Sequence, residues 1–320
     1  MHIFHIKPLI NYFNMTPLKY QITSISNQNQ NKILSWSWMI PIVLRNIFST
    51  WIICGFWDWI LYFSPLKEAL KPFKMNPKYP TTDQIFHDAF WTTSATITGS
   101  AVEILCCYAY CNNFFPPFEE DLTKHLFGNT AWVLLITHWR VIHFYAIHRL
   151  MHPWKTDKVP DIGKYLYRFV HSLHHKSYNP TAFSGTSMHP VESTLYYSAA
   201  LMAVPFGCHP AIVFACIVDC GVGAWLGHDG FQFPGTGDYF HFLHHSHFDC
   251  NYGTTIVPLD KWFGTFIGKK EDLKRVWKGK VTSTGMQANT TSVHLPKEDK
   301  KIPITVNLTD NRNNDLTFVQ

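Results

Sequence analysis

Long apolar stretches alternate with polar segments along this chain of 320 residues. Apolar runs cover about 40–63, 89–111 and 130–152, and each has about the 20 residues that a membrane helix needs. Two shorter apolar runs within 193–227 are separated by Pro205, Gly207 and Pro210, and they predict a helical hairpin that enters the bilayer. The pattern therefore predicts an all-α protein, an integral membrane bundle of about four membrane helices.

The polar segments divide the chain into four predicted parts. Residues 1–34 are rich in Asn and Gln, and residues 269–320 are polar, so we expect both ends to be loosely ordered. Between them we place N-terminal membrane helices over 35–128 and a further helical domain over 129–268. The run at 130–152 becomes more ionisable along its length, ending in His148, Arg149 and His152, which predicts a helix that leaves the membrane.

Composition supports a membrane protein with a substantial polar part. Apolar residues make up 46% of the chain and charged residues 15%, whereas soluble domains carry about 25% charged residues. The mean hydropathy of −0.07 requires that part of the chain lies in water. The net charge of +5 does not favour a nucleic-acid partner, and eight cysteines without a CxxC pair predict buried thiols in a reducing compartment.

Histidines are the most distinctive feature of the sequence. Three clusters stand out among 19 histidines: one HxxxH box and two HxxHH boxes, with two further single sites. Residues three or four apart share one helix face, so each box offers its imidazoles to one region. A single HxxxH box is a weak signal, but three boxes within about 100 residues predict a metal centre. The ten candidate ligands are His148, His152, His171, His174, His175, His189, His228, His241, His244 and His245.

Ten imidazoles exceed what one ion can bind. Two octahedral ions could take five each and keep positions for oxygen or a bridging group. Structural zinc uses four ligands, usually with cysteine, and no cysteine joins these boxes. The donor set therefore favours redox iron, although imidazoles alone would also accept zinc. His143 and His247 are the nearest competing histidines, and we expect neither to be a ligand.

The order HRLMH, HSLHH, PTAFSGTSMHPVE, GHDG and HFLHHSHFDCNYG over about residues 130–267 resembles the fatty acid hydroxylase superfamily, and most of all sterol 5(6)-desaturases. This resemblance implies a cytosolic helical cap that carries a His-rich di-iron site, with the ten histidines above as ligands. It also implies a multi-pass protein of the endoplasmic reticulum membrane with a cytosolic metal site. Its members use O2 and take electrons from NAD(P)H through a reductase and cytochrome b5. One departure is the connection of eighteen residues between His152 and His171, longer than in the sterol desaturases, which we expect to affect the substrate entrance.

The predicted reaction is desaturation or hydroxylation of a lipid, with a sterol favoured over a fatty acyl or sphingolipid substrate. A non-catalytic metal-binding membrane protein is the alternative of a different class, and a transporter with a histidine proton relay is a third reading. We expect Glu192 and Asp229 to orient metal-bound imidazoles, because carboxylates often do so. Five aromatic residues either line the lipid path or simply pack in the core: Phe183, Tyr196, Tyr197, Phe231 and Phe240.

Overall fold

The structure of the chain is a computed structural model. The model describes residues 36–112, 114, 124–156, 158–206, 208–234, 238–268, 306–307 and 317–318. The predicted polar segment 1–34 and most of the predicted tail 269–320 lie outside the described residues. Within the described part the structure is helical, apart from a two-residue antiparallel pair, β1 (Val306–Asn307) with β2 (Thr317–Phe318).

Helices joined by turns and irregular segments make up the rest of the described chain, in agreement with the predicted all-α class. The longer helices are α3 (Trp36–Asp58), α5 (Thr82–Cys111), α6 (Leu126–Met151) and α9 (Pro210–Leu226). The shorter ones are α4 (Lys67–Leu70), α7 (Ile162–Phe169), α8 (Pro190–Tyr197), α10 (Asp238–His247) and α11 (Leu259–Trp262). A π-helical turn (Trp59–Phe63) extends α3, and 3-10 helices cover Lys71–Phe73, His171–Lys176, Ala182–Thr186 and Ser198–Phe206.

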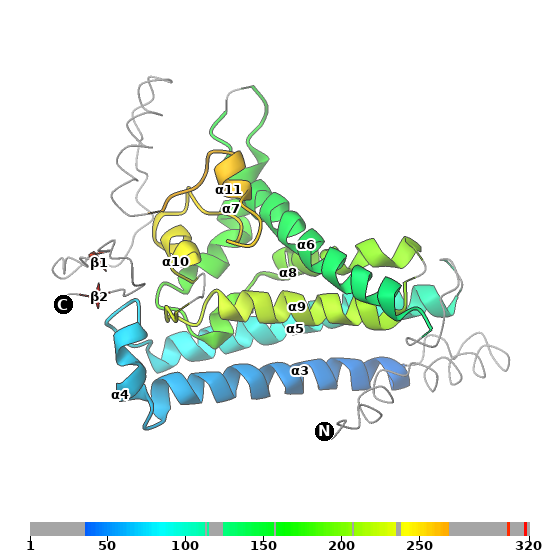
Figure 1. The fold of residues 1–320 in the computed structure, drawn as a ribbon, viewed down its shortest axis with the longest axis horizontal. Helices are drawn as coiled ribbons and strands as arrows, with labels where there is room; N and C mark the ends of the chain where they lie inside the picture. Colours follow the sequence, from blue (N-terminus) through cyan, green and yellow to red (C-terminus); the bar gives the residue numbers. More distant parts are fainter. Residues whose placement is uncertain are drawn as a thin grey trace.

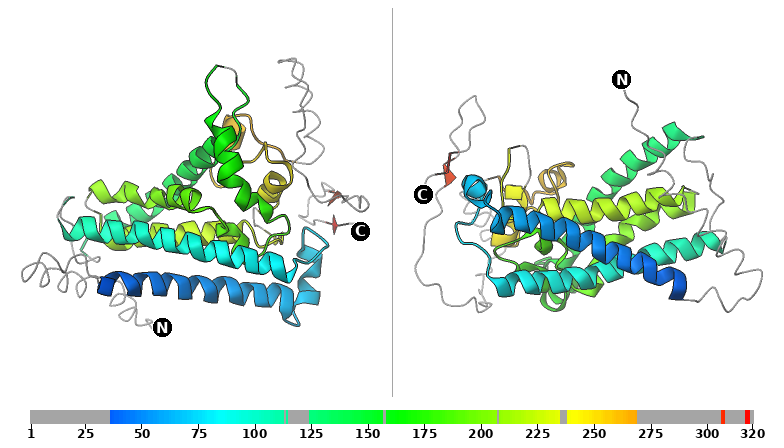
Figure 2. Two further views of the ribbon diagram at one scale, coloured as in Figure 1. Left: turned by 180° about the vertical axis from the view of Figure 1, so that it is seen from behind. Right: turned by 90° about the horizontal axis from the view of Figure 1, so that it is seen from below.

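The long helices form a layered bundle, and the short helices gather at one side of it. Helices α3, α5 and α9 run side by side, while α6 crosses them at an angle (Figures 1 and 2). The short helices α7, α10 and α11 lie together above one end of α9 (Figure 1). The main core lies where α5, α6 and α9 meet, and it includes Val102, Ile136 and Cys216.

Helix α5 shows how the bundle distributes its polar residues. Asp88, Thr92, Thr96, Ser100 and Glu103 recur at helical spacing and are all buried. Their hydrogen bonds are internal: Thr92 donates to the carbonyl of Phe183 at 2.5 Å, and Glu103 pairs with Arg45 of α3 at 2.5 Å. The polar face of α5 is therefore turned inward, as expected for a helix whose outer face meets lipid.

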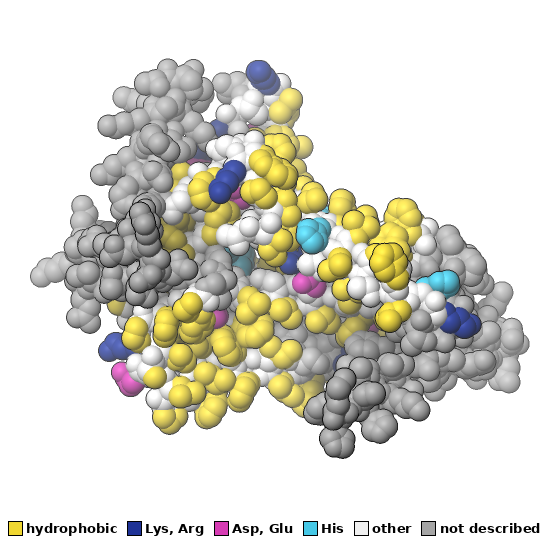
Figure 3. All heavy atoms as spheres, in the orientation of Figure 1, with side chains coloured by type: hydrophobic (Ala, Val, Ile, Leu, Met, Phe, Trp, Pro, Cys, Tyr) yellow, Lys and Arg dark blue, Asp and Glu magenta, His cyan; other side chains and the backbone are white. Residues whose placement is uncertain are grey.

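The outer surface of α3 and α5 is apolar instead. Large side chains such as Phe48, Phe56, Phe86 and Phe90 are more than half exposed. Figure 3 shows hydrophobic side chains gathered over this lower part of the molecule. Exposed apolar surface of this extent indicates contact with a membrane or a partner.

One membrane crossing is supported by length and composition within the described chain. The helix Trp38–Phe63 is long and apolar enough to span a bilayer, and Ala211–Leu226 is apolar but shorter. The structure therefore does not confirm the prediction of about four membrane helices. The reason is visible in α5, whose inward polar stripe lowers its apolarity although its outer face is exposed and apolar.

Candidate metal centre

Four elements bring the histidine boxes together. His148 and His152 lie one turn apart at the end of α6, and the second box forms the 3-10 helix His171–Lys176. The third box lies on α10, and His228 directly follows the end of α9. Segments separated by up to about 100 positions in the sequence thus meet at one end of α9.

Nine of the ten candidate histidines form two buried groups. His148, His152, His171, His175 and His244 make the first group, and His174, His228, His241 and His245 make the second. Within each group the potential ligand atoms all lie within 4.8 Å of one another. The two groups therefore offer five potential donors at one position and four at the other, whereas the sequence pattern allowed five at each.

Backbone carbonyls set the orientation of several imidazoles. Nδ1 of His148 lies 2.6 Å from the Tyr252 carbonyl, and Nδ1 of His244 lies 2.7 Å from the Cys250 carbonyl. Nδ1 of His228 lies 2.6 Å from the Ala224 carbonyl in the same way. A carbonyl oxygen only accepts, so Nδ1 must carry the proton, and Nε2 of each neutral ring then presents a lone pair.

These Nε2 lone pairs point at one another. Nε2 of His171 lies 3.0 Å from Nε2 of both His148 and His175, and Nε2 of His244 lies 3.2 Å from that of His175. In the second group, Nε2 of His228 lies 3.0–3.1 Å from those of His245 and His174.

Opposed lone pairs repel unless a cation lies between them. Two cis ligands of an octahedral ion are about 3 Å apart when each metal–nitrogen bond is about 2.1 Å. The distances between the imidazole nitrogens match this value. Nε2 of His241 is also buried without a hydrogen-bond partner among the described residues, and a metal ion would supply that partner. The donor set therefore fits two metal ions bound by neutral imidazoles.

Burial lowers the pKa of most imidazoles in the two groups. Desolvation lowers the pKa of His244 to about 3 and that of His228 to about 4, although in each a backbone hydrogen bond opposes the shift. The pKa values of His174, His175, His241 and His245 also fall well below the usual range, chiefly through burial and then through neighbouring imidazoles. Neutral rings are the form that binds metal, so the site is ready for a cation at neutral pH.

His189 lies outside both groups. Its Nδ1 accepts a hydrogen bond from the Val191 backbone at 3.2 Å and caps α8. A neutral ring would then carry its proton on Nε2. The role of His189 as a tenth ligand stays a prediction. The competing histidines also lie elsewhere: Nε2 of His143 lies 3.1 Å from the Ser198 hydroxyl, and Nδ1 of His247 lies 3.1 Å from the Leu243 carbonyl.

The two predicted orienting carboxylates have different surroundings. Glu192 lies on α8, and its Oε1 accepts from Nδ1 of His171 at 2.7 Å, with both side chains buried. Asp229 instead accepts from the Trp57 indole at 3.0 Å and from the Phe231 backbone at 2.9 Å. The contacts of Asp229 therefore connect the loop after α9 to α3, and among the described residues its carboxylate bonds to no imidazole.

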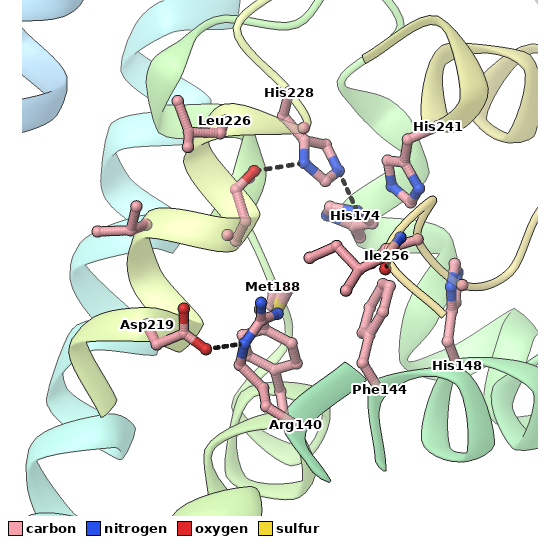
Figure 4. Close-up of a pocket in the computed structure, with 18 of the residues that line it drawn as sticks. Arg140, Phe144, His148, His174, Met188, Asp219, Leu226, His228, His241 and Ile256 are labelled. Atoms are coloured by element: carbon pink, nitrogen blue, oxygen red, sulfur yellow. Dashed lines mark hydrogen bonds and ion pairs between the residues drawn. The ribbon is translucent and has the colours of Figure 1, made fainter. Parts of the chain in front are cut away.

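A cavity of about 270 Å³ opens beside the histidines. Phe144, Met188 and Ile256 contribute apolar wall, and His148, His171, His174, His228 and His241 line the same cavity (Figure 4). Of the five predicted path aromatics, Tyr196 and Phe240 line it. Tyr197 lines a separate cavity between α3, α5 and α9, whereas Phe183 and Phe231 pack in apolar clusters.

An ion pair in the cavity wall was not predicted from the sequence. Arg140 of α6 donates from Nε to Asp219 of α9, and both residues line the cavity. The signal was visible as ionisable residues within apolar runs, but a single sequence does not show that the two meet.

The connection between His152 and His171 packs against the first box. Asp161 caps α7 and accepts from the backbones of Trp154, Lys155 and Lys164 at 2.9–3.2 Å. A Cβ atom on Gly163 would lie 2.1 Å from the His152 carbonyl oxygen, so α7 approaches this histidine closely. No described residue of the connection lines the cavity, so its expected effect on the substrate entrance stays a prediction.

The fold and the site define a helical protein with a buried cluster of histidines that could hold metal ions. The fatty acid hydroxylase family pattern matches residues 132–265, which carry all ten predicted ligands. Cholesterol 25-hydroxylase of Homo sapiens is 31% identical over 242 residues, covering 71% of this chain and 78% of that protein. The chain belongs to the fatty acid hydroxylase family, and its relatives in the sterol desaturase group agree with the resemblance described above.

Two further relatives carry sterol-related names. Methylsterol monooxygenase 1 of Gallus gallus is 23% identical over 279 residues, covering 75% of this chain and 85% of that protein. Delta(7)-sterol-C5(6)-desaturase of Nicotiana tabacum is 32% identical over 138 residues, covering 38% of this chain and 48% of that protein. No solved structure matches the chain significantly. These relationships place the chain among oxidoreductases of lipid metabolism.

Proposed function

We propose that the protein is a membrane-bound, non-haem di-iron oxygenase that uses O2 to hydroxylate or desaturate a lipid, with a sterol as the favoured substrate class. The observation that carries the proposal is the set of buried, neutral imidazoles whose Nε2 lone pairs converge in two groups beside a largely apolar cavity. The names of the relatives favour a sterol, and they include both hydroxylating and desaturating enzymes.

The histidines present fit two iron ions. The first group would hold one ion with His148, His152, His171, His175 and His244, and the second would hold another with His174, His228, His241 and His245. Imidazole suits iron as well as zinc, and four or five donors leave octahedral positions open. When bound, the ions would supply the redox chemistry that activates O2 for attack on an unactivated C–H bond.

The chain itself would position the substrate and exclude water from the reacting groups. Phe144, Met188 and Ile256 offer apolar surface against which a lipid can lie beside the histidines. The imidazoles are held by backbone carbonyls and by Glu192, so the ligand shell keeps its geometry when the substrate enters. Burial excludes bulk water from the reacting groups, which protects the site from side reactions.

The overall balance requires an external electron source. Hydroxylation consumes one O2, two electrons and two protons and releases one water, whereas desaturation releases two waters. We infer that the electrons come from NAD(P)H through cytochrome b5 and its reductase, at a cytosolic site of the endoplasmic reticulum membrane. The resemblance to sterol desaturases supports this route.

The test combines metal content with lipid analysis. Cells with and without the protein are compared by mass spectrometry of sterols, acyl chains and sphingolipids, and the purified protein is assayed for iron. We expect a product that is lighter by two hydrogen atoms or heavier by one oxygen atom. His244→Ala should lose iron and product, whereas His247→Ala on the same helix should keep both, because His247 lies outside the two groups.

The alternatives predict other outcomes. A changed acyl or sphingolipid product, with sterols unaltered, would identify a fatty acyl or sphingolipid hydroxylase. Normal iron content without any altered lipid would refute the proposed oxygenase activity and support a non-catalytic metal-binding protein.

A further inference from the structure

An ion pair lies in the wall of the histidine cavity. Arg140 and Asp219 belong to different helices, α6 and α9, and the Arg140 side chain is 5% exposed. Figure 4 shows the pair on one side of the cavity and His228, His241 and His148 on the other. A charged pair in an otherwise largely apolar cavity wall is costly to bury, which suggests that the pair has a functional role.

The pair has hydrogen-bonding capacity left over. Nε of Arg140 donates to Oδ2 of Asp219, while no hydrogen bond from Nη1 or Nη2 is found among the described residues. Gly223 makes room for these atoms, because a Cβ there would lie 2.9 Å from Nη1 and 3.1 Å from Nη2. Oδ1 of Asp219 likewise has no partner among the described residues, and the Asp219 side chain is 30% exposed. The wall therefore offers free donors next to a free acceptor.

We propose that the Arg140–Asp219 pair binds the hydroxyl group of the lipid substrate, so that the cavity selects a lipid alcohol. A hydroxyl group both accepts and donates, so it can receive a hydrogen bond from Arg140 and give one to Asp219. An ether or a ketone can only accept, and a carboxylate would compete with Asp219 for the guanidinium. The ion pair is thus complementary to a neutral alcohol.

This assignment also gives the substrate a direction. With its hydroxyl group at Arg140 and Asp219, the apolar body of the lipid would lie along Phe144 and Ile256, between the pair and the histidines in Figure 4. The C–H bond that reacts would then be remote from the hydroxyl group. The direction of attack rests on the proposed oxygenase function, whereas the binding of the hydroxyl group does not.

Binding competition tests the assignment without turnover. Purified metal-loaded protein in detergent binds tritiated cholesterol, which is displaced by unlabelled cholesterol, cholesteryl methyl ether, 1-hexadecanol or palmitic acid. We expect cholesterol to compete about 10- to 100-fold better than its methyl ether, the range for a hydrogen bond to a charged group. If tritiated cholesterol does not bind, tritiated 1-hexadecanol is used as the labelled ligand, with 1-hexadecyl methyl ether as the competitor. Binding of only the second label would identify a simple long-chain alcohol instead of a sterol as the ligand.

Two double variants separate recognition from stability. Arg140→Leu/Asp219→Leu removes both charges together, which buried pairs tolerate better than loss of one partner. It should bind the alcohol and its ether about equally while keeping its metal. The matched control is Arg45→Leu/Glu103→Leu, because that interhelical pair between α3 and α5 does not line the histidine cavity. The control should keep the preference for the alcohol.

Each other outcome decides against the assignment. Equal binding of alcohol and ether by the wild-type protein overturns it, and so does a preference that survives in Arg140→Leu/Asp219→Leu. Strongest displacement by palmitic acid, or failure of both labelled alcohols to bind, would also overturn it. If the preference for the alcohol holds but no lipid is oxidised, the proposed function fails while the hydroxyl-binding pair stands.

Discussion

Replacement of Glu192 tests how the metal centre is held. Oε1 of Glu192 accepts from Nδ1 of His171 at 2.7 Å, and Nε2 of the same ring faces those of His148 and His175 at 3.0 Å. The carboxylate therefore determines which nitrogen is protonated and where the lone pair points. Glu192→Leu removes the acceptor, so His171 can turn or exchange its tautomer.

The expected loss can be estimated in two ways. Removal of a carboxylate that orients a metal-bound imidazole typically lowers metal affinity about 10- to 100-fold. A buried hydrogen bond to a charged group contributes about 1.5–3 kcal/mol, which corresponds to about the same factor. Glu192→Gln retains an acceptor oxygen but lacks the charge. Since neutral hydrogen bonds are about half as strong, its loss should be only about 3- to 10-fold.

The assay is iron affinity, measured by competition with a chelator, together with turnover of the identified lipid. Asp229→Asn is the matched control, because its carboxylate contacts Trp57 and the Phe231 backbone instead of an imidazole. It should lower thermal stability but leave iron affinity within about twofold of the wild type. Unchanged iron affinity in Glu192→Leu would refute the reasoning, and an equal loss in Asp229→Asn would show that the effect is not specific to the imidazole contact.

Three further substitutions test other parts of the structure. Burial lowers the pKa of Lys74 from 10.5 to about 8, so between these pH values the unfolded chain binds more protons at this site, and Lys74 should add about 3 kcal/mol to stability as the pH rises. The stability difference between the wild type and Lys74→Met in thermal unfolding should change by about that amount, and a difference that stays constant with pH would contradict it. Gly163→Ala places a Cβ 2.1 Å from the His152 carbonyl and should lower iron content. Gly128→Ala should not, because no described atom outside its own stretch of helix lies within 4 Å of the new Cβ. Asp88→Ala leaves the hydroxyl groups of Ser177, Ser184 and Ser187 without their acceptor and should cost about 2–5 kcal/mol in denaturant unfolding; a cost under about 1 kcal/mol would show that water replaces the carboxylate.

The histidine clusters were predictable because their spacing is local. Two imidazoles three or four residues apart share a helix face whatever the rest of the chain does, and His241 with His245 on α10, both in the second group, illustrates this. Spacing within a box does not show which box meets which. His174 and His175 are neighbours in one box, yet the structure places them in different groups, because adjacent residues point in different directions from a short helix.

The membrane helices were harder to predict from apolar runs. The run at 40–63 corresponds to a helix that is apolar over most of its length, whereas α5 combines an apolar outer face with a buried polar one. Hydropathy averages these two faces, so it does not predict the contacts of α5 with Arg45 and with the 3-10 helix at Phe183. The same limit applies to Arg140 and Asp219, which are 79 residues apart and meet only through the packing of α6 on α9.

The buried polar groups of α5 connect the bundle to the metal centre. Asp88 accepts from Ser177, Ser184 and Ser187, which lie on the segment that follows the second histidine box. The Ser187 carbonyl in turn lies 3.4 Å from Nδ1 of His174. A charged residue in the bundle thus fixes the loop that orients a candidate ligand. The inward polar stripe that makes α5 less apolar than a simple membrane helix is therefore part of what positions the second histidine group.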